Sequence, residues 1–147
     1  MARTPSAVAR GVGQLALGAV LLTAGTAHLT TQREEFQAQV PSWFPVDADL
    51  VVVASGIVEL SLGAALLVIW KQPARAWVGV VAALFFIVIF PGNVAQFLEH
   101  KDGFGLDTDL KRGIRLLFQP LLVLWALWAA NSRRTLRTRD GASGSTR

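Results

Sequence analysis

The stretch Leu50–Trp70, LVVVASGIVELSLGAALLVIW, decides the fold. It is 21 residues long, and two serines and one acid, Glu59, are its only strongly polar side chains. About 20 apolar residues in a helix cross the hydrocarbon core of a bilayer, so the stretch predicts a transmembrane helix. Glu59 lies nine residues from its start, or roughly 13 Å at 1.5 Å per residue, which is close to mid-membrane. An acid at that depth is costly in lipid and should face protein or a water-filled cavity.

Two glycines share the helical face of this acid. Gly56 precedes Glu59 by three residues and Gly63 follows it by four. Small residues on that face would let a neighbouring helix approach closely. We therefore expect the rest of the chain to be arranged around Glu59.

The composition predicts an integral membrane protein. The chain has 147 residues, of which 52% are hydrophobic, too many for an ordinary soluble domain. We predict an all-α fold, a polytopic four-transmembrane-helix bundle with a short interfacial helix after the first span. The predicted membrane domain covers residues 1–130, and a disordered Arg/Gly/Ser-rich cytoplasmic tail covers 131–147. The spans are predicted at about 7–29, 50–70, 74–98 and 113–130.

Several local signals refine this outline. A cleaved secretory signal peptide is the competing interpretation of the first apolar run. Thr31 and Glu34 have capping-box spacing and predict a short helix through about Gln39. Pro91, followed by glycine, predicts an interruption of the third span. Asp109 is a candidate N-cap for the fourth.

The basic residues predict the orientation. With four spans, nine lysines and arginines fall on the side of the termini and five on the opposite side, together with eight acids. Positive residues favour the cytoplasmic side, so both termini are predicted to be cytoplasmic. The excess of arginine over lysine is typical of GC-rich bacterial genomes, which indicates a bacterial inner membrane. The basic tail is short and lacks aromatics, so we expect no nucleic-acid partner.

Six polar residues are predicted to gather in the outer half of the bundle. Their depths follow from the topology, and every span contributes at least one. They are His28, Glu59, Asn93, Gln96, Arg115 and Gln119. Together with the proline breaks they predict an outward-facing polar pocket. In this hypothesis Glu59 is a catalytic proton carrier and the other five bind a ligand. The chain has no cysteine and two histidines, so we predict no metal site and no covalent cofactor.

Each of these residues also has a plainer interpretation. Glu59 could be a buried carboxyl neutralised by Arg115 or hydrogen-bonded to a serine. His28 could contact lipid headgroups, and Arg115 could extend to the interface as a topology anchor. The amides of Asn93, Gln96 and Gln119 could form interhelical hydrogen bonds. The hypothesis of a site depends on the convergence of these residues.

Five short motifs resemble the DoxX family of four-helix integral membrane proteins, over about residues 10–130. They are Gly25-Thr26-Ala27-His28, Val40-Pro41-Ser42-Trp43-Phe44-Pro45, Gly56-Ile57-Val58-Glu59, Phe90-Pro91-Gly92-Asn93 and Arg115-Leu116-Leu117-Phe118-Gln119. The family is named from a subunit associated with a terminal quinol oxidase and with thiosulfate:quinone oxidoreduction. The resemblance implies a membrane setting of quinone chemistry.

Three hypotheses for function follow. The first is a membrane protein that binds a quinone-like molecule in the polar pocket and supports redox chemistry. The second is a non-catalytic anchor or assembly subunit of a redox or oxidative-stress complex. The third is a small transporter, which would require a homo-oligomer because four spans without a repeat do not form a path. All three place the chain in a lipid bilayer, and the first two add a redox partner protein.

Overall fold

The computed structural model describes residues 4–131 of the chain and contains five helices in that part. They are α1 (Pro5–Leu29), α2 (Arg33–Gln37), α3 (Ala48–Val68), α4 (Ala74–Leu98) and α5 (Asp109–Ala129). All except α2 are long and apolar enough to cross a membrane. The predicted all-α fold with four spans is therefore confirmed. The predicted tail, apart from Asn131, lies outside the described residues.

Two predicted helix starts are wrong. α2 begins at Arg33 after Gln32, which makes no side-chain capping bond, so the Thr31–Glu34 capping box does not form. α5 begins four residues before the predicted span, and its N-cap is Thr108 rather than Asp109. The Thr108 hydroxyl accepts a hydrogen bond from the Lys111 amide and satisfies one free donor of the first turn.

The predicted interruption of the third span is also wrong. α4 continues through Pro91 to Leu98, and α5 likewise continues through Pro120. Both prolines are exposed, so each ring lies on the outer surface of its helix. Each proline removes one backbone hydrogen bond, but the rest of the ladder continues and the helix does not break.

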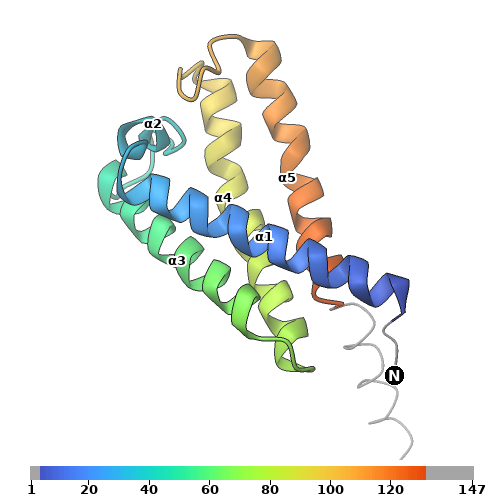
Figure 1. Ribbon diagram of the computed structural model, residues 1–147. Coiled ribbons are helices and arrows are strands. Elements are labelled where there is room, and N and C mark those ends of the chain that lie inside the picture. Colours follow the sequence, from blue (N-terminus) through green and yellow to red (C-terminus); the bar gives the residue numbers. More distant parts are fainter. Residues whose placement is uncertain (1–3, 132–147) are drawn as a thin grey trace, which may run out of the picture.

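The four long helices form two antiparallel pairs, α1 with α3 and α4 with α5, and α1 crosses the second pair (Figure 1). Glycines bring α1 and α3 together. A Cβ atom on Gly25 would lie 2.8 Å from the Gly56 carbonyl oxygen, and one on Gly63 would lie 2.9 Å from that of Gly18. The backbones therefore touch at two levels, as small residues allow in membrane helices. This packing favours a structural span over a cleaved signal peptide.

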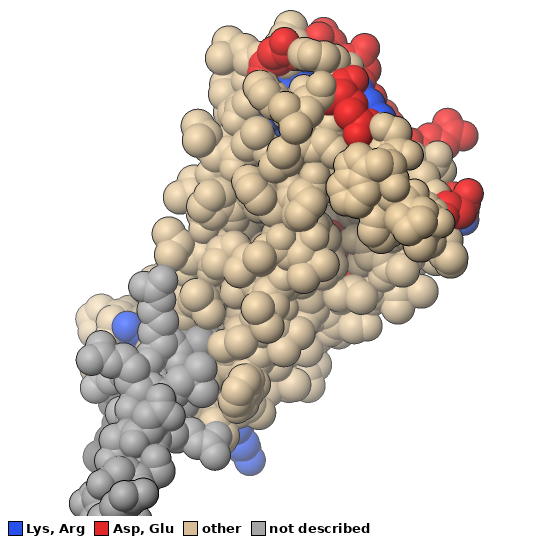
Figure 2. Space-filling model, turned by 180° about the vertical axis from the view of Figure 1, so that it is seen from behind, with Lys and Arg blue, Asp and Glu red and all other residues tan. Residues whose placement is uncertain are grey.

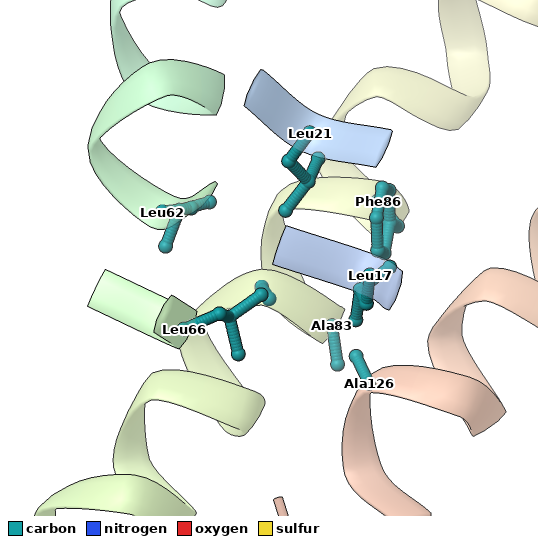
Figure 3. Packing of buried hydrophobic residues seen from close by; sticks show 8 residues of the cluster. Leu17, Leu21, Leu62, Leu66, Ala83, Phe86 and Ala126 are labelled. Atoms are coloured by element: carbon teal, nitrogen blue, oxygen red, sulfur yellow. The ribbon is translucent and has the colours of Figure 1, made fainter. Parts of the chain in front are cut away.

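The apolar core lies where the two pairs meet (Figure 3). Leu17 and Leu21 of α1 point toward Leu66 of α3 and toward Phe86 of α4. Ala126 supplies the contact from α5 and is completely buried. The small side chain of Ala126 lets α5 approach the core at this level.

The two ends of the bundle differ in charge. The loop end carries residues 30–49 with α2, residues 99–108 and the start of α5, and the terminal end carries the start of α1, residues 69–73 and the end of α5. Figure 2 shows the acidic side chains gathered at one end, with some basic ones among them, and only basic side chains coloured at the other end. Eight of the ten acids of the chain belong to the loop end: Glu34, Glu35, Asp47, Asp49, Glu99, Asp102, Asp107 and Asp109.

Candidate functional site

Glu59 and His28 form a buried acid–base pair between α1 and α3. Nδ1 of His28 lies 2.9 Å from Oε2 of Glu59, and both side chains are less than a tenth exposed. The carboxyl group therefore faces protein and not the acyl chains. Its contact is with His28, and no ion pair or hydrogen bond within residues 4–131 joins Glu59 to Arg115 or to a serine.

The direction of helical side chains explains why these two residues meet. Side chains of an α-helix lean toward its N-terminus, and α1 and α3 are antiparallel. His28, in the last turn of α1, therefore leans back into the bundle, whereas Glu59 leans toward the loop end. The absent Cβ of Gly56 leaves room for His28, because a methyl group there would lie 2.8 Å from the His28 Cβ.

A backbone carbonyl fixes the proton on the near side of the imidazole ring. His28 Nδ1 also lies 2.9 Å from the Ala24 carbonyl oxygen, which can only accept a hydrogen bond. Nδ1 must therefore carry a proton, which it donates to the Ala24 oxygen. Glu59 Oε2 lies 2.9 Å from the same nitrogen but is buried and accepts no hydrogen bond among residues 4–131. The proton-accepting positions of the pair are therefore the Glu59 carboxylate and His28 Nε2.

Two phenylalanines cover this pair at the loop end. The Phe36 ring of α2 stacks on the imidazole with centroids 3.3 Å apart, and the Phe104 ring packs edge-on against Phe36 at 4.5 Å. The Glu35 carboxylate accepts a hydrogen bond from the Phe104 amide and ties the two loops together. The acid–base pair thus lies beneath a roof of two aromatic rings.

A second polar group joins α4 to α5. Arg115 donates from Nε to Asn93 Oδ1 at 3.2 Å, and Asn93 Nδ2 donates to Gln119 Oε1 at 3.1 Å. Gln119 Nε2 then donates to the Phe86 carbonyl oxygen at 2.6 Å. The expected interhelical hydrogen bonds of Asn93 and Gln119 are present, and they form one chain that begins at the guanidinium.

The aromatic roof connects the two polar groups. Cζ of Arg115 lies 5.4 Å from the centroid of the Phe104 ring, in a cation–π contact. No ion pair joins Arg115 to Glu59 within residues 4–131, and the carboxylate of Glu59 contacts His28. The two rings therefore link His28 and its partner Glu59 to Arg115 and its hydrogen-bonded chain, so that five of the six predicted site residues, on four different helices, belong to one connected set of contacts.

Gln96 does not join them. Its side chain is 1% exposed, and Nε2 donates to the Lys101 carbonyl oxygen at 3.4 Å. It anchors the loop after α4. Arg112, which the sequence analysis did not single out, is equally buried there and pairs with Asp102 and Asp109. One turn before Arg115, it closes the same loop over the bundle.

The cavity that the structure shows does not coincide with this polar cluster. It is an apolar groove of about 370 Å³ on the flank of α4 and α5, with Phe86 and Pro120 among its lining residues. Gln119 also lines it, but neither Glu59 nor His28 does. This groove is therefore not the expected polar pocket, and the open space beside Gln119 is apolar.

Phe36 and Phe104 are the site residues that the sequence analysis missed. Phe36 and Val40 lie four residues apart in an otherwise polar segment, and both are buried. That spacing is an apolar stripe on a short helix, and it could have indicated a segment that folds back onto the bundle. Phe104 has no comparable signal, since it lies in an irregular loop with φ 57°.

Comparisons with known proteins place the chain in a family without an assigned function. No curated protein and no solved structure matches it. A family model described as a domain of unknown function, DUF8561, matches residues 17–130. That match includes all six predicted site residues, the aromatic roof and three complete spans. The chain belongs to the DUF8561 family.

Proposed function

We propose that this protein binds a quinone-like molecule in the membrane and that the Glu59–His28 pair exchanges a proton with it. The observation that carries the proposal is the 2.9 Å contact between two buried titratable groups at membrane depth. Ionisable residues inside a membrane are costly and usually mark a ligand or proton pathway. The resemblance to the DoxX family adds the expectation that the ligand belongs to membrane redox chemistry.

Different residues of the cluster would transfer the proton, orient the ligand and exclude water. The Glu59 carboxylate or His28 Nε2 would accept or deliver the proton, because His28 Nδ1 already donates to the Ala24 carbonyl oxygen. Arg115 and the amide of Asn93 would orient the oxygen of the head group. Phe36 and Phe104 would cover the acid–base pair and exclude water. Electrons would come from a redox partner protein or from the quinone itself.

The setting follows from the charge of the two ends. Positive residues favour the cytoplasmic side, so we place both termini in the cytoplasm and the loop end outside. The arginine-rich composition supports a bacterial inner membrane as the location. In this orientation the polar cluster lies in the outer half of the bilayer, and the apolar groove of α4 and α5 faces the acyl chains.

The proposal is tested with Glu59→Gln. This change keeps the shape of the side chain but removes the exchangeable proton. We expect a short-chain quinone to bind wild-type protein in detergent and to bind Glu59→Gln about tenfold more weakly, a difference of about 1.4 kcal/mol. Glu34→Gln, an acid-to-amide change at an exposed position of α2, is the control and should leave the affinity unchanged. Equal affinity of all three proteins would contradict the proposal, as would a lipid extract of the purified protein that contains no quinone.

A second function, an assembly subunit of a redox complex, is favoured by one observation. The segment between α2 and α3 exposes Trp43 by 71%, with Phe44 and Val46 each 41% exposed. Such a segment could dock on a partner as well as on the membrane interface. In that function Glu59→Gln would be silent, and changes in residues 30–49 or 99–113 would abolish co-purification of the partner.

A further inference from the structure

Arg115 differs from the other cations of the loop end. Every other lysine or arginine there has a carboxylate within ion-pair distance: Arg33 with Asp49, Lys101 with Glu99, Lys111 with Asp107, and Arg112 with Asp102 and Asp109. Arg115 has none among residues 4–131. Its Nε donates to the neutral amide of Asn93, and its terminal Nη groups make no hydrogen bond within that part of the chain.

Its position makes this difference important. Arg115 lies six residues into α5, or roughly 9 Å along the helix axis at 1.5 Å per residue, and it is half-buried. A guanidinium withdrawn from water needs an anionic partner with good geometry, because the desolvation cost is otherwise not offset. The buried acid of the bundle is Glu59, and its carboxylate contacts His28 rather than Arg115.

We infer that the ligand of this site is a weak organic acid with an apolar body, and that Arg115 holds its ionised oxygen while the Glu59–His28 pair keeps its proton. This inference specifies the ligand class of the proposed function and depends on that function for the location of the site. Guanidinium donors suit an oxyanion, because charge-assisted hydrogen bonds are about twice as strong as neutral ones.

The proton balance is simple. The O–H bond of the acid breaks, the proton goes to the Glu59 carboxylate or to His28 Nε2, and the electron pair stays on the oxygen beside Arg115. No electron is transferred. Without ligand, no carboxylate among residues 4–131 contacts Arg115; after binding, the oxyanion supplies that contact. A neutral acid can therefore enter from the bilayer without carrying charge into it.

Within residues 4–131, His28 and Glu59 are the only buried side chains that can act as a base toward this proton. The charged or titratable groups that face the cluster are His28 from α1, Glu59 from α3 and Arg115 from α5. α4 contributes the amide of Asn93. The segment with α2 contributes the Phe36 ring and Glu35. The Glu35 carboxylate accepts a hydrogen bond from the Phe104 amide at the roof.

The test compares naphthoquinone with its hydroxylated form, which is ionised in water at neutral pH. Both are titrated into the full-length protein in detergent by calorimetry, in two buffers of different ionisation enthalpy. We expect the hydroxylated quinone to bind at least about tenfold more tightly than the parent, with uptake of one proton per ligand bound. Binding of the parent quinone should be accompanied by no proton uptake. This measurement needs only the wild-type protein.

Two variants of α5 locate the anion. Arg115→Gln should reduce the affinity for the hydroxylated quinone to that for the parent, whereas Arg115→Lys should restore part of the difference. Lys111→Gln removes a positive charge from the exposed end of the same helix and should change neither affinity, which excludes a general attraction of anions to the loop end.

The outcomes separate this inference from the proposed function. Equal binding of both quinones without proton uptake would overturn the inference and leave the proposed function standing. If neither quinone binds but dodecanoate does, with dependence on Arg115 and with no binding of dodecanol, the inference stands and the quinone function fails. Absence of binding by all four compounds would overturn both.

Discussion

The α1–α3 pair and the α4–α5 pair are held together by different kinds of contact. Between α1 and α3 the backbones touch at glycines, and their polar contacts lie toward the two ends, at Gln14 and at His28. Between α4 and α5 the contacts are made by side chains, through the hydrogen-bonded chain that includes Asn93 and Gln119. An apolar groove remains open along the flank of the second pair.

The difference shows how the bundle can combine a fixed acid with an adaptable ligand site. Glycine contacts allow one helix spacing only, so they hold Glu59 and His28 in register. Side-chain hydrogen bonds can lengthen or exchange partners, so α4 and α5 can adjust around a ligand. Each helix pair contributes half of the candidate site. The rigid α1–α3 pair contributes Glu59 and His28, which hold the proton, and the adaptable α4–α5 pair contributes Arg115.

The largest effect is expected at the glycine contact. In Gly25→Ala the new methyl group would lie 2.8 Å from the Gly56 carbonyl oxygen and 2.9 Å from the Leu60 amide nitrogen, so two backbones must separate. We expect this overpacking to lower the free energy of unfolding by about 1–3 kcal/mol, measured by denaturation in mixed micelles. Gly11→Ala in the same helix meets only the Trp70 ring at 3.6 Å and should be neutral or slightly stabilising. Equal losses in both variants would contradict the role of backbone contact.

A smaller effect is expected at the side-chain contact. Gln119→Leu removes the hydrogen bonds to Asn93 and to the Phe86 carbonyl oxygen. Interhelical hydrogen bonds in membranes contribute about 0.6 kcal/mol on average, so we expect a loss of about 1 kcal/mol for the two. A double-mutant cycle with Asn93→Leu isolates the coupling between the two side chains. A loss as large as that of Gly25→Ala would mean that α4 and α5 are as tightly fixed as α1 and α3.

Much of this contrast could be predicted from the sequence. The apolar run around Glu59 predicts a span, and the spacing of Gly56 and Gly63 predicts the close approach of a second helix on the face of the acid. The amides of Asn93 and Gln119 were expected to bond across helices, and they do. These features depend on periodicity along one helix, which a sequence displays directly.

The partner of Glu59 could not be predicted in the same way. The choice between His28 and Arg115 depends on the relative height of three helices and on the direction in which each side chain leans. A shift of one turn would change the partner, and no pattern within a single span fixes that height. Pro91 was misjudged for a related reason, since its effect on α4 depends on which surface of the helix its ring faces.

The aromatic roof was missed because loops must fold back to build it. Phe36 and Phe104 lie 68 residues apart, and their contact depends on hydrogen bonds between the segment that contains α2 and the loop after α4. The Glu35 carboxylate bonds to the Phe104 amide, and Lys101 Nζ donates to the Val40 carbonyl oxygen at 2.7 Å. Hydrogen bonds of this kind leave no periodic pattern in the sequence.

Polar contacts between these loop segments also join the two helix pairs at the loop end. Low pH should weaken such contacts while the glycine contacts persist. Glu99, at the end of α4, accepts from Lys101 and from Ser42, which lie in the two loops, and these partners lower the pKa of Glu99 from 4.5 to about 2. Because the pKa of Glu99 is lower in the folded state, the stability that this carboxylate contributes is fully present above its unfolded-state pKa. That stability is lost as the pH falls toward its folded-state pKa. We therefore expect the Ser42 amide, whose N–H donates to Glu99 at 3.2 Å, to lose protection from hydrogen exchange between about pH 4.5 and pH 2. In Glu99→Gln the amide should be less protected already at neutral pH and should show no such acid step, whereas amides near Gly25 should stay protected in both proteins. If the Ser42 amide of Glu99→Gln still lost protection between these pH values, another group would be responsible for the loss. The Glu99 contact would then not be what joins the two helix pairs at the loop end.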